Sequence, residues 1–272
     1  MITWALAWTN AKIVNEYLSF YNLIFIRFLL GFMSLIPFVF IFKNKFPRLM
    51  DFKYIILPSI LFLIYNIAFF KGTYYGLAGK GAILVTTLNP LFTVFIMSVI
   101  NKKISKHDLI GVSLGIIGGI IIMDLYSIGL QGIFQSGNLY FIVCAISWGI
   151  MTVLINYAQK IINPYIFICL CYFITMIMTL PFINPYELLI ANLDFRFYIN
   201  FFFVSLGAMS FGTSIYMYYT PVLGPSKASI FIFSVPFLAI ALANIFLNEP
   251  FSLNIIIGGT ISLLAIYIVN RK

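Results

Sequence analysis

The chain has 272 residues, of which 62% are hydrophobic and 8% are charged, and its mean hydropathy is +1.07. Ordinary soluble domains carry roughly a quarter charged residues, so this composition excludes a soluble fold. The net charge of +9 comes from basic residues in short connections between apolar runs, a pattern typical of membrane orientation and not of nucleic-acid binding. We therefore expect a chain embedded in a lipid bilayer, with no nucleic acid as a partner.

Catalytic and metal-binding patterns are missing from the sequence. Cys144, Cys169 and Cys171 all lie in apolar runs, where thiols usually behave as small hydrophobes. The single histidine, His107, lies in a connection, and neither a glycine-rich phosphate loop nor a nucleophile elbow occurs. We expect no catalytic residue, no metal and no cofactor, and hence a protein that is not an enzyme.

Interruptions of the apolar runs by charge, Pro, Gly and Asn clusters predict an all-α membrane protein of about ten transmembrane helices. The predicted helices cover 1–14, 19–43, 53–76, 81–100, 107–124, 137–160, 164–183, 197–219, 226–247 and 253–270. Helix 1–14 rises only about 21 Å, less than the hydrocarbon core of about 30 Å. Either this helix is abbreviated or the true start of the chain lies upstream; no cleavable signal peptide is visible.

The positive-inside rule orients these helices. With a cytoplasmic N-terminus and alternating helices, eleven basic residues fall on the inner side and only Lys80 and Arg196 on the outer side. The inner residues are Lys43, Lys45, Arg48, Lys53, Lys102, Lys103, Lys106, Lys160, Lys227, Arg271 and Lys272. We expect both termini in the cytoplasm and a bacterial-type inner (plasma) membrane.

Two halves of the chain, 1–124 and 137–270, show weak internal similarity. Pro90 and Pro236 each lie nine residues beyond a matching position, Gly81 or Lys227. The helices that contain them end in matching segments, Asn101 to Ser105 and Asn248 to Ser252, and Trp8 and Trp148 mark similar positions in 1–14 and 137–160. Since each half has five helices, the halves must be inverted relative to each other, a common plan of secondary transporters. Proline in both helices would bend them and provide hinges, although membrane helices also tolerate proline without a function.

Several segments resemble a known family. "AWTNAKIV", "FIRFLLGFMSLI" and "SVPFLAIALANIFLNEPFSLNIIIGGTISLLAIYIV" are similar to the drug/metabolite transporter superfamily, specifically its EamA-like group of ten-helix transporters. The resemblance implies a central cavity lined mainly by the helices over 1–14, 53–76, 81–100, 137–160, 197–219 and 226–247. It also matches Arg27, Pro90, Pro236 and Glu249 to family positions. Where the first half of the family usually carries a second glutamate, this chain has Lys102 and Lys103.

Three basic residues fall within predicted spans, where charge is costly and often functional. Lys12 can pair with Glu16 one turn later, and we expect a structural role for it. Arg27 lies too deep for easy snorkelling, and both structural pairing and substrate contact remain open. Lys71 either snorkels to the outer interface or binds a substrate carboxylate or phosphate. Asn66 lies about 140° around the same helix from Lys71, so both cannot face one ligand.

Polar and aromatic residues complete the candidate cavity. Thr86, Asn89 and Thr93 form one polar stripe beside Pro90, and the serines of 226–247 give a thinner counterpart. Such hydroxyls also serve simply to join helices. The residues expected to line the cavity are Trp8, Asn66, Lys71, Thr86, Asn89, Trp148, Tyr216 and Ser229; the expected hinges are Pro90 and Pro236; and Arg27 and Glu249 are expected as structural charges.

Glycines recur four residues apart over 107–124, at Gly111, Gly115 and Gly119, and are echoed by Gly258 and Ser262. This spacing predicts close helix packing, either within the chain or with a second protomer in a homodimer through 107–124 and 253–270. All seven acids fall at helix ends or connections, so we expect no buried carboxylate for proton coupling.

The sequence therefore predicts a secondary transporter, an exporter or exchanger, that moves a small polar metabolite such as an amino acid or organic anion by alternating access. The competing interpretations are a membrane scaffold without transport and a membrane-embedded enzyme. A scaffold needs no cavity, and an enzyme needs converging polar groups, whereas the acids of this chain are scattered over different connections.

Overall fold

The computed structural model describes residues 1–41, 46–102, 105–135, 137–250 and 252–270, and every regular element among them is helical. Lys43, Lys45, Lys103, Arg271 and Lys272, which contributed to the predicted orientation, lie outside the described residues. The helices of the first half are α1 (Ile2–Val14), α2 (Phe20–Ile41), α3 (Lys53–Tyr75), α4 (Ala78–Ile100), α5 (Lys106–Ile122) and the short α6 (Leu125–Ile128). Those of the second half are α7 (Asn138–Ala158), α8 (Pro164–Thr179), α9 (Pro185–Ile190), α10 (Phe195–Phe202), α11 (Ser214–Leu223), α12 (Pro225–Ile230), α13 (Val235–Leu247) and α14 (Leu253–Asn270).

Each of the ten predicted helices is present. In the described part of the chain six helices are long and apolar enough to cross a membrane, and three apolar helices are shorter. The expected helix over 197–219 consists of α10, the π-helical segment η4 (Phe203–Thr213) and α11. The expected helix over 226–247 is broken into α12, a 3-10 turn η5 (Phe231–Ser234) and α13. Helix α1 has 13 residues, in agreement with the predicted short first helix.

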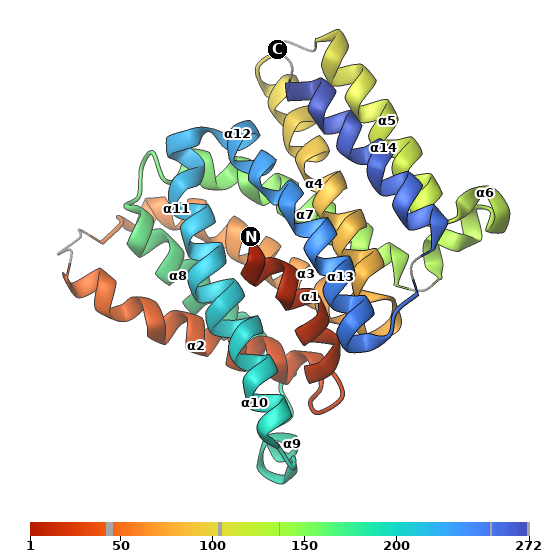
Figure 1. Cartoon of the computed structure of the whole chain (residues 1–272). Helices are drawn as coiled ribbons and strands as arrows, with labels where there is room; N and C mark the ends of the chain where they lie inside the picture. Colours follow the sequence, from red (N-terminus) through yellow and green to blue (C-terminus); the bar gives the residue numbers. More distant parts are fainter. Residues whose placement is uncertain (42–45, 103–104, 136, 251, 271–272) are drawn as a thin grey trace.

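Helix α1 lies at the centre of the bundle, with its N-terminal end among the other helices (Figure 1). It packs against η4 and α13, while α3 and α4 both pack against α7. Helices α5 and α14 lie side by side at one edge of the molecule, and α2 and α8 pair at the other (Figure 1). The two halves therefore interdigitate around α1.

The predicted glycine packing occurs within the chain. A Cβ at Gly118 of α5 would meet the carbonyl oxygen of Gly258 at 2.7 Å and the hydroxyl of Ser262, both in α14. Gly115 and Gly119 instead face leucines of α4. Because a larger side chain cannot fit between backbones this close, the glycines allow α5 to pack on two neighbours at once. Association of two chains through α5 and α14 stays a prediction.

If successive helices alternate in direction, the connections that follow α1, α3, α8 and α13 all lie on the same side of the molecule, and the structure shows contacts among them. Lys12 at the end of α1 reaches the turn between α3 and α4 and the turn between α13 and α14. Glu187 of α9 accepts hydrogen bonds from Ser19 at the start of α2. We call this side of the molecule the Glu249 face. Which side of a membrane it occupies stays a prediction.

Candidate functional site

A small cavity lies at the centre of the molecule. Its volume is about 40 Å³, room for only a few water molecules and far below the roughly 300–1,000 Å³ of typical ligand pockets. The cavity in this structure is therefore too small to hold a metabolite. Its lining residues come from α1, α2, α3, α4, α7, η4 and the 3-10 turn η5, and they are Trp4, Ala7, Trp8, Arg27, Tyr65, Phe69, Val85, Thr86, Asn89, Trp148, Ala208, Thr213 and Ile232.

Among these lining residues, Arg27 alone carries a charge. Its side chain is 5% exposed and donates to Asn66 Oδ1 at 2.6 Å and to the carbonyl of Val204 at 3.1 Å. The guanidinium also lies 5.4 Å from the ring centroid of Phe69, within the range of a cation–π interaction. In the described part of the chain no carboxylate pairs with it. The buried positive charge is thus oriented by neutral groups, with no carboxylate beside it among the described residues.

The π-helical segment η4 supplies acceptors to this site. In a π-helix the backbone N–H of residue i+5 donates to the carbonyl of residue i, and such segments often occur at functional sites. Within η4 the side-chain hydroxyl of Thr213 also donates to the carbonyl of Ala208 at 3.0 Å. Carbonyls of η4 accept from three side chains of other helices: Arg27 Nε donates to Val204 at 3.1 Å, Trp4 Nε1 to Ala208 at 3.0 Å, and Tyr172 Oη to Met209 at 3.0 Å. The local widening of this helix therefore holds the cation and one tryptophan of the cavity in place.

Aromatic rings form one end of the cavity. The ring centroid of Trp148 lies 5.1 Å from Trp4, 4.8 Å from Tyr65 and 5.8 Å from Tyr216. Tyr216 is held in turn by Thr152, since their hydroxyls are 3.1 Å apart. Rings at these separations gain contact energy from edge-to-face and tilted packing. Beyond Tyr216 a larger apolar cleft of about 740 Å³ opens at the N-terminal end of α1, lined by residues of α1, η4, α11, α12 and η5.

The geometry of a central cavity between two similar halves agrees with comparisons to known proteins. The EamA-like transporter family matches residues 1–124 and 135–271. The chain belongs to the EamA-like transporter family. It is accordingly a membrane transporter and not an enzyme, and the ten helices are those of the family fold.

Individual relatives agree with this assignment. An uncharacterized transporter of Archaeoglobus fulgidus is 23% identical over 276 residues, which cover 99% of this chain and 95% of that protein. The uncharacterized transporter YoaV of Bacillus subtilis is 25% identical over 208 residues, covering 76% and 71%. A crystal structure of a protein 15% identical to this chain has a TM-score of 0.61 and covers 98% of this chain and 94% of that one, so it has the same fold.

Four of the predicted cavity residues of this EamA-like transporter line the central cavity: Trp8, Thr86, Asn89 and Trp148. Asn66 lies behind it as the partner of Arg27. Tyr216 lies between the cavity and the larger cleft.

Two other predicted residues point elsewhere. Lys71 Nζ lies 4.8 Å from the ring centroid of Phe20 and 5.9 Å from that of Tyr140, away from the cavity lining. The Ser229 hydroxyl is buried and donates to the carbonyl of its neighbour Ser226 at 2.8 Å. The side chain of Ser234 lies outside the described part of the structure.

The two proline positions differ in local structure. Pro90 is buried within the continuous helix α4. Pro236 instead follows the 3-10 turn η5 as the second residue of α13, where a missing N–H removes no intrahelical bond. The two corresponding prolines therefore lie in different structures: Pro90 in one continuous helix, and Pro236 in a helix that is interrupted by η5.

Nine of the thirteen lining residues were not among the predicted cavity residues, and Trp4, Tyr65 and Thr213 are three of them. Trp4 precedes Trp8 by four residues and so shares its helix face, a spacing that could have identified it. Tyr65 adjoins Asn66 in α3 but carries no polar pattern that distinguishes it from other aromatics. Thr213 reaches the cavity through the π-helical geometry, which the 3.6-residue period does not anticipate.

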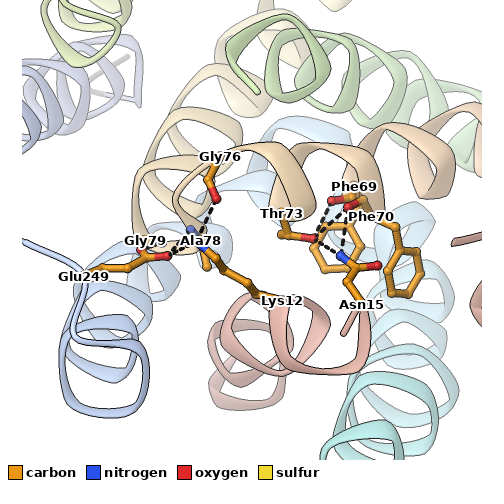
Figure 2. Close-up of polar contacts among 9 residues, drawn as sticks. All are labelled: Lys12, Asn15, Phe69, Phe70, Thr73, Gly76, Ala78, Gly79 and Glu249. Atoms are coloured by element: carbon orange, nitrogen blue, oxygen red, sulfur yellow. Dashed lines mark hydrogen bonds and ion pairs between the residues drawn. The ribbon is translucent and has the colours of Figure 1, made fainter. Parts of the chain in front are cut away.

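A second polar cluster lies at the Glu249 face (Figure 2). Glu249 accepts from Lys12 Nζ at 2.9 Å and from the backbone N–H groups of Ala78 at 2.7 Å and Gly79 at 2.8 Å. Lys12 also donates to the carbonyl of Gly76 at 2.9 Å.

The predicted pairing of Lys12 with Glu16 is therefore wrong. Glu16 lies beyond the end of α1, off its helical face, and pairs with Arg196 at 3.1 Å. The expectation that the chain has no buried carboxylate is also wrong, because Glu249 is 7% exposed. Although it lies in a connection, the helices α1, α4 and α13 enclose it.

Proposed function

We propose that this EamA-like transporter is an exporter or exchanger of a small carboxylate-bearing metabolite, such as an amino acid or organic anion, which it moves by alternating access. The observation that carries the proposal is the buried guanidinium of Arg27, which has no carboxylate partner among the described residues. A charge inside a membrane costs a few kcal/mol or more unless it is paired or hydrated. A substrate carboxylate would compensate this charge when it binds.

The remaining lining groups suit the other parts of such a substrate. Thr86 and Asn89 of α4 provide a hydroxyl and an amide on one side of the cavity. Trp4, Trp8 and Trp148 provide apolar walls. A site with few polar groups among aromatic walls is typical of small-molecule pockets.

The conformation supports alternating access. The cavity is too small for a metabolite, and the Glu249 face is closed by hydrogen bonds between the halves. The cleft of about 740 Å³ at the opposite end of α1 ends at Tyr216, one ring away from the cavity. Rotation of the Trp148 and Tyr216 rings, together with separation of the helices, would connect the two spaces. We further propose that the Glu249 face is extracytoplasmic and that the membrane is a bacterial-type plasma membrane, since this places the basic connections inside.

Transport by purified protein in liposomes tests the substrate class. A panel of amino acids and organic anions should contain at least one compound that the wild-type protein exchanges and that raises its melting temperature. The amide derivative of that compound, which lacks the negative charge, should fail in both assays. Absence of exchange across a broad panel would contradict the proposal.

Arg27→Gln provides the residue-specific test. The apparent Kd for the carboxylate should rise about tenfold to a hundredfold, because a charge-assisted hydrogen bond contributes about 1.5–3 kcal/mol. Arg196→Gln is the matched control, since Arg196 is 53% exposed and pairs with Glu16 at the surface. Equal losses in the two variants would remove Arg27 from the binding site.

Solvent access to the cavity distinguishes transport from a scaffold role. Single cysteines at Asn66, Thr86 or Trp148 should react with a thiol reagent from each side of the membrane in different conformations. Complete protection at all three positions would favour a scaffold.

A further inference from the structure

The carboxylate of Glu249 closes one face of the molecule through contacts that span most of the chain. It belongs to the turn between α13 and α14, in the second half, and its three donors belong to α1 and α4, in the first half. Asn248, with φ 52, ends α13 in a left-handed conformation that asparagine tolerates, and the amide of Asn244 donates to the Glu249 carbonyl at 2.9 Å. The backbone thus directs the carboxylate toward the start of α4 (Figure 2).

Each of the three contacts is favourable for a physical reason. The N–H groups of Ala78 and Gly79 belong to the first turn of α4, where the helix dipole attracts an anion and the donors lack helical partners. Lys12 adds a charge-assisted bond at 2.9 Å. Because the side chain of Glu249 is buried, solvent screens these interactions less than at a surface.

The inverted half lacks the anion, the cation and one of the two N–H donors of this cluster, and the remaining N–H, that of Gly224, donates to the carbonyl of Thr220. The match of Pro90 with Pro236 aligns Ala78 and Gly79 with Gly224 and Pro225, and proline has no N–H to donate. The match of Asn101 with Asn248 aligns Lys102 with Glu249, so a cation replaces the anion. The match of Trp8 with Trp148 aligns Thr152 with Lys12, so a hydroxyl replaces the ammonium group. At the opposite face the repeat therefore cannot form the same cluster.

We propose that Glu249, Lys12 and the first two N–H groups of α4 form a one-sided latch. The latch closes the cavity at the Glu249 face, and the absence of its counterpart biases the resting transporter toward the conformation closed at this face. This inference rests on the alternating access of the proposed function. Opening at the Glu249 face separates the carboxylate from its donors, so each cycle breaks and re-forms the latch.

A second carboxylate, that of Glu187, also forms contacts at this face, but it lies at a different part of the bundle from Glu249. Glu187 of α9 accepts from the backbone N–H of Ser19 at 2.7 Å and from its hydroxyl at 2.6 Å, at the start of α2. This contact lies at the side of the bundle where α2 and α8 pair. The Glu249 contact, by contrast, lies at the start of α4, a helix that lines the cavity. Glu249 is therefore the group whose removal should open the cavity most directly.

Side-specific labelling tests the latch without knowledge of the substrate. Val85 lines the cavity, and Val85→Cys places a reactive thiol there. Cys144, Cys169 and Cys171 are replaced by alanine in the same protein. The rate at which a membrane-impermeant maleimide labels the new cysteine then measures access to the cavity. Intact cells and inside-out vesicles expose opposite faces. A cysteine at Tyr186, which is exposed on α9 at the Glu249 face, identifies which preparation presents that face.

Glu249→Gln should raise the labelling rate from the Glu249 face about tenfold, the change that follows from losing one charge-assisted hydrogen bond. The rate from the opposite face should fall, because the two open conformations exclude each other. General loosening of the fold would instead raise both rates and would overturn the latch, as would rates equal to wild type at both faces. Glu16→Gln, which breaks the exposed pair with Arg196 at the same face, should change neither rate.

Lys12→Met keeps both backbone contacts of Glu249 and should shift the two rates in the same opposite directions by a smaller factor. It decides the question if Glu249→Gln does not fold, and unchanged rates would then overturn the latch. Transport of the carboxylate panel is measured separately, so failure of the latch leaves the test of Arg27 intact.

Discussion

Arg27 Nη1 lies 2.6 Å from Oδ1 of Asn66, and this contact joins α2 to α3 behind the central cavity. The amide nitrogen of Asn66 donates to the carbonyl of Phe62 at 2.9 Å, which directs its oxygen toward the guanidinium. A neutral amide orients the cation without neutralising it. The positive charge consequently stays available to a ligand.

Asn66→Asp would replace that amide with a carboxylate at the same distance. The new anion should pair with Arg27 and compete with a substrate carboxylate, so the Kd for the transported anion should rise about tenfold or more. Isothermal titration of the purified protein measures the change. Asn254→Asp is the matched control, since it adds the same charge at the surface, where Asn254 accepts from the Tyr126 hydroxyl. An unchanged Kd in Asn66→Asp would contradict the assigned role of Arg27.

Lys71→Met should leave carboxylate transport within about twofold of wild type. The ammonium group lies over the Phe20 ring and away from the cavity lining, so its loss costs a cation–π contact of about 0.5–1 kcal/mol and no substrate contact. Initial rates of exchange in liposomes, compared with Arg27→Gln, decide between the two cations. A selective loss of anionic over neutral substrates in Lys71→Met would instead restore Lys71 to the site.

Pro236→Ala should slow turnover several-fold with little change in substrate affinity. Without the proline ring, η5 and α13 can join α12 in one continuous helix, and the broken segment that allows bending is lost. Pro90→Ala, in the continuous helix α4, serves as the comparison and should have the smaller effect. Maximal exchange rate and half-saturation concentration are measured together. A change confined to half-saturation would argue against a hinge at Pro236.

Gly118→Val should destabilise the protein by about 1–3 kcal/mol, the usual cost of overpacking. The added side chain would collide with the Gly258 carbonyl and with Ser262 across the contact of α5 with α14. Thermal unfolding in detergent measures the loss, and Ile117→Val, on an exposed position of the same helix, is the control. A molecular mass determined by light scattering in the same detergent tests the predicted homodimer. If Gly118→Val changed the oligomeric state without changing the stability of the monomer, the glycines would serve association instead.

The sequence analysis was most successful for features set by local patterns. Apolar length and interrupting residues predicted all ten helices. The family resemblance named six helices for the cavity, and α2, which it did not name, lines the cavity as well through Arg27. Thr86 and Asn89 were predicted from their spacing on one helix face, and Trp8 and Trp148 from their similar positions in the two halves; all four line the central cavity, and their role in binding stays a prediction. The partners of Arg27 and Lys12 could not be found in this way, because Asn66 and Glu249 are 39 and 237 residues distant in the chain.

Hydropathy alone therefore determined the membrane class and the helices, because these depend on composition and local periodicity, whereas the two inverted halves stay a prediction from internal similarity. Tertiary structure decided which cation faces the cavity. Arg27 and Lys71 both lie within apolar segments of the sequence, but only Arg27 is directed into the cavity, by hydrogen bonds to residues of α3 and η4. It also decided that Glu249 is buried. A residue in a connection becomes enclosed only when helices distant in sequence pack around it, and no local pattern records that packing.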